Sequence, residues 1–187
     1  MTFAELKAGV ESAVGRTDIP DYVYQHATAS IDRTLRTRHQ EKVATVSISG
    51  GKAPLPSDYL SMVAVWNGDR TKQVHPLGQS SAGSWSWYVI SWRDIEFSSD
   101  ISGATIVYHA SLPGLSANSD TNVALDNWPD LYHHLSVHHA ALWAMDGDLA
   151  RSSLEAADMI AARIMREDAY SRFGGNIGAR ATTGISF

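Results

Sequence analysis

Two different spacings of hydrophobic residues divide this chain of 187 residues. Near both ends, hydrophobic residues recur every three to four positions, which is the spacing of an amphipathic helix. In the middle, between residues 43 and 115, they alternate with polar residues, which is typical of strands with one buried face. The pattern therefore predicts helices at both ends of the chain and a sheet inserted between them.

The helix expected over residues 128–145 is the one around which the other helices should pack. It contains no Asp, Glu, Lys or Arg after Asp130. Asn127 is its expected cap, and Pro129 suits its first turn. A helix without charge on either side has to be covered on both sides. The face expected to be buried carries Leu131, Leu135, His138, Leu142 and Met145.

Three further helices are expected around this central one. Thr2 and Glu5 have the spacing of a capping box, and Gly15 suits the end of a helix over residues 2–15. A second helix is expected over residues 19–40, with Asp18 as its cap. A last helix, over residues 148–170, follows the central one after a short turn, so these two should be antiparallel.

The middle of the chain predicts a meander of about five or six strands. Asn67 and Gly68 favour a hairpin turn between two of them. The segments with strand character are residues 43–49, 60–66, 71–75, 87–90, 94–97 and 104–109.

We therefore expect an α+β chain that is mainly a helical bundle, with two N-terminal and two C-terminal helices. An antiparallel β-meander is inserted over residues 43–115. One domain is expected over residues 1–170. Residues 171–187 hold four glycines and no helical period, which predicts a flexible C-terminal docking arm. The side chains expected to make its contacts are Phe173, Ile177, Arg180, Ile185 and Phe187.

Composition and charge narrow the classes of function. The net charge of −5 argues against a dedicated nucleic-acid binder, which normally has a basic face. The absence of Cys excludes disulfides and thiolate metal sites. No segment has the length and hydrophobicity of a membrane span, and the N-terminus lacks the pattern of a signal peptide. The sequence also lacks the G-x-S-x-G and phosphate-binding glycine motifs of common enzymes.

Histidines on the central helix are the one feature that resembles an enzyme site. His134 and His138 have the i, i+4 spacing that presents two imidazoles to one metal. Leu135 stands where a zinc-protease helix has its Glu, and a third ligand such as His109 or Asp146 would have to come from elsewhere. The alternative is a set of buried or interface histidines, which would weaken assembly in mild acid if they gain charge below about pH 6.5. The cluster comprises His133, His134, His138 and His139.

Two other clusters of side chains, one aromatic and one basic, each allow a structural and a functional interpretation. Trp85, Trp87 and Trp92, with Tyr88, suit either the stacking of sugars or bases or, more commonly, a sheet core or protein interface. A small basic patch on the second helix suits a subunit or DNA contact, although such patches are usually solvated. Its residues are Arg33, Arg36 and Arg38.

In their order and spacing, six blocks of the sequence resemble the head–tail connector (adaptor) proteins of tailed bacteriophages. The resemblance covers nearly the whole chain, and the histidine pairs at 133–134 and 138–139 depart from the usual apolar and small residues. The blocks are I-P-D-Y-V-Y-Q-H-A-T-A-S-I-D-R-T-L-R-T-R (19–38), L-P-S-D-Y-L-S-M-V-A-V-W (55–66), W-Y-V-I (87–90), D-I-E-F (94–97), I-V-Y-H-A-S-L-P-G-L-S (106–116) and the segment from T-N to H-H-A-A-L-W (121–143).

The resemblance implies a structural virion protein without catalytic residues, metal or cofactor. Such proteins assemble in the host cytoplasm as a ring of about twelve subunits beneath the portal protein. The ring extends the channel through which DNA passes without sequence-specific binding, and it gives tail or nozzle proteins a docking platform. The arm 171–187 would grip the portal. The alternatives are a metal-dependent enzyme built on the His133–His139 cluster and another tail completion protein.

Overall fold

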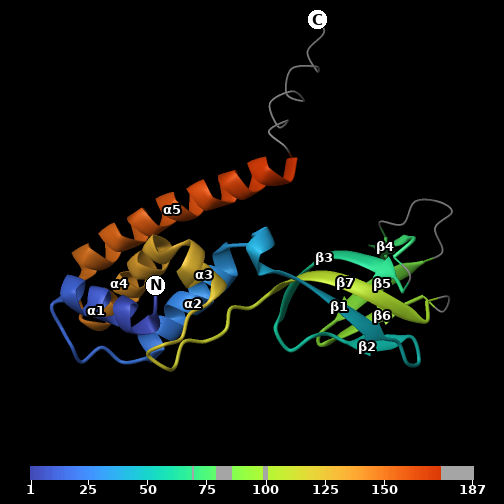
Figure 1. The fold of residues 1–187 in the computed structure, drawn as a ribbon, viewed down its shortest axis with the longest axis horizontal. Helices are drawn as coiled ribbons and strands as arrows, with labels where there is room; N and C mark the ends of the chain where they lie inside the picture. The colour runs from blue at the N-terminus through green and yellow to red at the C-terminus, as the bar shows by residue number, and fades with distance from the viewer. Residues whose placement is uncertain (69, 79–85, 99–100, 174–187) are drawn as a thin grey trace, which may run out of the picture. The chain divides into compact units, whose positions relative to one another are not determined.

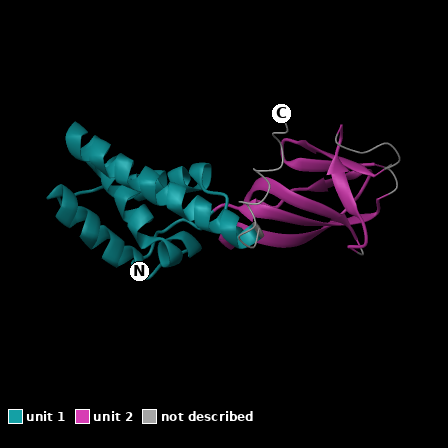
Figure 2. Cartoon of the chain, turned by 90° about the horizontal axis from the view of Figure 1, so that it is seen from above, with its two compact units in different colours: residues 1–38, 112–187 teal, residues 39–111 magenta. Residues whose placement is uncertain are grey.

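The chain folds into two compact units, one helical and one built of strands. The computed structural model describes residues 1–68, 70–78, 86–98 and 101–173 (Figure 1). Unit 1 comprises residues 1–38 and 112–187, and unit 2 comprises residues 39–111 (Figure 2). The chain thus leaves the helical unit once and returns to it at Leu112, whose backbone N–H donates to the Asp32 carboxylate over 3.1 Å.

Helix α4 lies at the centre of unit 1. It contacts α1, α2, α3 and α5, and Figure 1 shows these helices around it. The prediction of a central, covered helix is therefore confirmed. The helices are α1 (Phe3–Val14), α2 (Tyr22–Thr34), α3 (Val123–Asn127), α4 (Pro129–Trp143) and α5 (Gly147–Phe173), and a short 3₁₀ helix η1 (Arg38–Gln40) follows α2.

Local signals mark the ends of α1 correctly. The Thr2 hydroxyl accepts from the Glu5 N–H, the Glu5 carboxylate accepts from the Thr2 N–H, and Gly15 follows the last turn at φ 71°. The ends of α4 and α5 differ from expectation. Asn127 belongs to α3, which the sequence did not reveal, and its side chain donates to the Val123 carbonyl. The cap of α5 is Asp146, whose Oδ1 accepts from the Leu149 N–H at 3.0 Å.

Helix α2 is shorter than the sequence suggested. It begins at Tyr22, after Asp21, and Asp18 binds Arg16 rather than the helix. It ends at Thr34 because Leu35 is extended, with ψ 138°. The guanidinium of Arg36 donates to the carbonyls of Asp32 and Leu35, which satisfies acceptors that the helix end leaves open.

The described residues of unit 2 form a single sheet of seven strands in the order β1-β7-β3-β4-β5-β6-β2. Strands β4 and β5 are parallel, and the other neighbours are antiparallel. A bridge from Ser49 to Lys52 links the ends of β1 and β2, so the sheet is nearly closed like a barrel. The strands are β1 (Glu41–Ser47), β2 (Lys52–Pro54), β3 (Tyr59–Asn67), β4 (Gln73–Pro76), β5 (Trp87–Ser91), β6 (Asp94–Phe97) and β7 (Gly103–Ala110).

The predicted fold class, mainly a helical bundle with an inserted antiparallel meander, is wrong. The β3–β4 hairpin at Asn67 is present, but β1 pairs along its whole length with β7, from Glu41↔His109 to Ser47↔Gly103. Alternation reveals strands but not their partners, and pairing between the first and last strands leaves no local signal. The sheet also has its own core, which includes Val65, Ile95 and Ile106, all fully buried.

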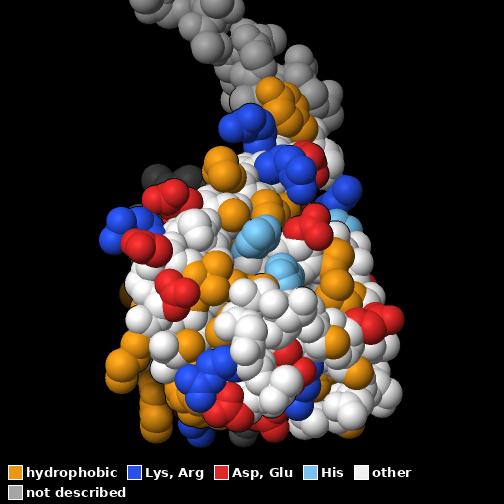
Figure 3. All heavy atoms as spheres, turned by 90° about the vertical axis from the view of Figure 1, so that its left-hand side faces the viewer, with side chains coloured by type: hydrophobic (Ala, Val, Ile, Leu, Met, Phe, Trp, Pro, Cys, Tyr) orange, Lys and Arg blue, Asp and Glu red, His pale blue; other side chains and the backbone are white. Residues whose placement is uncertain are grey.

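The predicted core face of α4 is buried only at its N-terminal end. Leu131 is 1% exposed, whereas Leu142 is 54% and Met145 is 94% exposed. Met145 lies beyond the end of α4, in a turn at φ 60° that leads into α5. Figure 3 shows hydrophobic and histidine side chains at the surface on one face of the molecule.

Replacing Leu131 by Ala should therefore lower the free energy of unfolding by about 2–5 kcal/mol, because it leaves a cavity in the core. The matched change at Leu142, on the same helix, should alter it by no more than about 0.5 kcal/mol. Denaturant unfolding of both variants measures this. Equal losses would contradict the burial that we assign to the two ends of α4.

Candidate functional site

The tip of the β5–β6 hairpin presents a tryptophan in an unusual conformation. Ser91 pairs with Asp94, so Trp92 and Arg93 form a two-residue turn. Trp92 has φ 56° and is 88% exposed. Positive φ at this position favours Gly, and a bulky residue there costs about 1–3 kcal/mol. Because most of this side chain is in contact with solvent, its burial within the unit offsets little of this cost.

A cleft of about 580 Å³ adjoins this turn in unit 2. The Arg93 guanidinium lies 5.1 Å from the centroid of the Trp92 ring, and the Arg93 carbonyl accepts from the Leu55 N–H at 2.8 Å. This hydrogen bond holds the 54–57 segment beside the hairpin. Trp, Tyr and Arg are the residues most enriched at energetic centres of protein interfaces. We define the Trp92 surface as Pro54, Leu55, Pro56, Ser57, Tyr59, Trp92, Arg93 and Asp94.

The other aromatic residues of the predicted cluster serve different purposes. Tyr88 is buried in the core of unit 2, and burial raises the pKa of its hydroxyl. Trp87 is half-buried on β5, and Trp85 lies outside the described residues. The sequence identified Trp92 as an interface candidate, but it gave no sign of its exposure or of its backbone conformation.

Two of the four histidines of α4 make hydrogen bonds within unit 1. His138 Nδ1 donates to the Ala150 carbonyl over 2.8 Å, and His139 Nε2 lies 3.0 Å from the Ser30 hydroxyl. Burial lowers the pKa of His139 to about 4, helped by repulsion from His138, His26 and Arg33. Burial also lowers the pKa of His133. In the subunit itself, the His139 ring therefore stays neutral in mild acid.

The structure does not bring the histidines into a metal site. Within the described ranges, no three His, Asp or Glu side chains converge on one point as ligands. Asp146, a suggested third ligand, caps α5, and His109 Nδ1 lies 3.0 Å from the Ser61 hydroxyl in unit 2.

The three arginines of the predicted basic patch belong to different segments. Arg33 is exposed on α2, Arg36 follows that helix and binds its last carbonyls, and Arg38 lies in η1. The Arg38 backbone N–H donates to the Asp168 carboxylate over 3.1 Å. The docking-arm side chains are not placed: Phe173 ends α5, and Ile177, Arg180, Ile185 and Phe187 lie outside the described residues.

Stability should depend on pH through His139. When the pH falls from 7 to 4.5, the unfolded chain binds a proton on this residue at its ordinary pKa of 6.5, whereas the folded chain does not, so folding weakens. His139→Gln should remove this part of the loss, about 1–2 kcal/mol, because the ring is partly in contact with solvent. Denaturant unfolding at both pH values measures it. Wild type and variant losing equal stability would contradict the low pKa.

Comparison with known proteins supplies the family. The chain matches the family model described as SU10 adaptor protein over residues 1–180. No curated protein matches it. In the part of the chain that the structure describes, no helix has the length and hydrophobicity to cross a membrane. The resemblance to phage adaptor proteins is thus confirmed: the chain belongs to the SU10 adaptor protein family, whose members are structural head–tail adaptors of bacteriophage virions.

Proposed function

We propose that this chain forms a ring beneath the portal protein, extends the DNA channel and gives the tail its docking platform. The family match over residues 1–180 carries the proposal, because it covers both units. As the resemblance to phage adaptor proteins implies, the ring has about twelve copies and is assembled in the host cytoplasm before it becomes part of the virion. The net charge of −5 suits a channel along which DNA slides without adhering.

The Trp92 surface is the docking platform for a tail or nozzle protein in this proposal. Its support is the combination of an 88% exposed indole, an adjacent cleft and a backbone conformation that costs stability. A residue that strains the backbone and lowers the stability of the fold is expected where function requires it. The partner would bury the indole against the prolines and Tyr59 of the cleft, as the anchor residue of an interface.

The portal contact falls to the C-terminal arm, residues 171–187, in the same proposal. The arm begins in the last turn of α5, and its Ile and Phe side chains suit apolar anchors. Arg33, Arg36 and Arg38 are assigned to contacts with a neighbouring subunit or with DNA. Imaging of the assembled particle tests the position of the ring, because a tail completion protein would lie elsewhere.

Trp92 should show opposite effects on stability and on docking. Trp92→Gly should raise the free energy of unfolding by about 1 kcal/mol, because glycine adopts this φ without strain. The same change should reduce the joining of tails to heads by at least about tenfold, since the interface loses its anchor. Trp92→Ala is the matched control, because it removes the ring but keeps the strain. Tails that join normally to heads built with both variants would refute the platform.

Removal of residues 174–187, the part of the arm beyond α5, should separate folding from portal binding. A chain ending at Phe173 keeps α5 and the Arg172–Asp168 ion pair, whose atoms are 2.6 Å apart. It should unfold at the same denaturant concentration as the full chain and should no longer co-sediment with portal rings. Portal binding by the truncated chain would assign that contact to another surface.

A further inference from the structure

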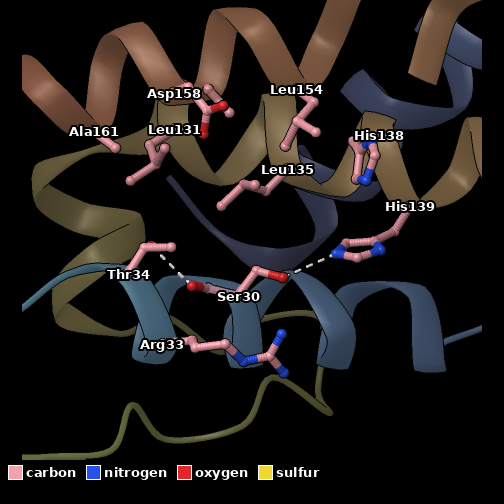
Figure 4. A pocket seen from close by; sticks show the side chains of 11 residues that line it. Ser30, Arg33, Thr34, Leu131, Leu135, His138, His139, Leu154, Asp158 and Ala161 are labelled. Carbon is pink, nitrogen blue, oxygen red and sulfur yellow. Dashed lines mark hydrogen bonds between the residues drawn. The ribbon is translucent and has the colours of Figure 1, made fainter. Parts of the chain in front are cut away.

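A groove on unit 1 runs between α2 and α5, with α4 as its floor (Figure 4). The surface of its cavity of about 140 Å³ is mainly apolar, although polar side chains also line it. Leu131 and Leu135 form the floor, and Leu154 of α5 remains 38% exposed. Leu131 and Leu135 are themselves buried, so the apolar surface open to solvent is that of Leu154 at the rim, which suits contact with a bound polypeptide.

The two walls of this groove carry opposite charges. Arg33 stands on the α2 wall and Asp158 on the α5 wall (Figure 4). Both are exposed, and within the described part of the chain neither is assigned a hydrogen bond or an ion pair. A ligand of this groove is therefore expected to place an acidic group near Arg33, an apolar group over the floor and a basic group near Asp158.

The outer face of α5 has this arrangement of groups. Glu155, Met159 and Arg163 follow one another at intervals of four residues, so they form a single stripe about 12 Å long. Met159 is 71% exposed. It lies about 140° around the helix from Leu154, which faces the groove. We call these three residues the α5 stripe. The stripe and the groove thus occupy different faces of one helix.

We propose that the α5 stripe of one copy binds in the groove of the next copy. Met159 enters the cavity, where an unbranched thioether adapts well to an irregular space. Glu155 then lies near Arg33, and Arg163 lies near Asp158. Because each copy presents the stripe on one face and the groove on another, the contact is head-to-tail and can repeat from copy to copy. The inference rests on the proposed ring and names the surfaces that would build it.

Charge exchange between the two surfaces tests this contact. Asp158→Arg and Arg163→Asp should each reduce the assembled fraction by about tenfold, because each places like charges opposite one another. The double variant exchanges the two charges and should restore assembly to within about threefold of wild type. Both positions changed are exposed in the subunit, so unfolding measurements should show equal stability. A double variant that assembles no better than the single variants would overturn the proposal.

Cross-linking gives an independent readout in the cysteine-free chain. Leu154→Cys with Met159→Cys should yield a ladder of disulfide-linked multimers in assembled rings. Within one copy these positions lie on different helix faces, too far apart for a disulfide. Met145→Cys with Met159→Cys is the matched control and should yield no ladder. Rings that form without the ladder would refute this contact while leaving the proposed function intact, whereas a chain that forms no rings would refute both.

Discussion

The fold of unit 1 depends on the need to cover the apolar side chains of α4, most of which are buried. Tyr132 and Ala140 are fully buried on this helix, and between Leu131 and Trp143 it carries no Asp, Glu, Lys or Arg. Helices from both ends of the chain provide the cover, with α1 and α2 from the N-terminal part and α3 and α5 from the C-terminal part. The hydroxyls of Thr28 and Tyr132 meet inside this core and link α2 to α4. Unit 2 can be inserted because the two halves of unit 1 hold one another.

Signals carried by a few neighbouring residues were read correctly from the sequence. The capping box at Thr2, the left-handed Gly15 and the hairpin at Asn67 each depend on contacts within about five residues. Pairing between distant strands has no such signal, so the β1–β7 contact and the nearly closed sheet were missed. The end of α2 was also missed, because the chain becomes extended at Leu35 without a Gly or Pro to mark the change.

In the candidate sites, too, the sequence showed local features but not those that depend on distant parts of the chain. Trp92 was identified by residue type alone, but its left-handed φ arises from the register of Ser91 with Asp94, which only the structure gives. Leu142 and Met145 were assigned to the core by helical spacing, and the spacing itself holds on α4. Helical spacing does not show where the neighbouring helices end. Near Met145 the chain turns and continues as α5, so this side chain is exposed.

Both proposed contacts use groups that the fold of a single subunit leaves unused. A folded domain gains stability by burying apolar groups and pairing charges, so an exposed indole on a strained turn and a row of exposed Glu, Met and Arg add little to it. In the proposed adaptor ring, these groups contribute binding free energy only when another chain covers them. Two histidines of α4 differ from these exposed groups. His138 and His139 have hydrogen-bond partners within unit 1. Packing inside the subunit therefore accounts for these two histidines, whereas the proposed contacts use α5 for the neighbouring subunit and the Trp92 hairpin for the tail.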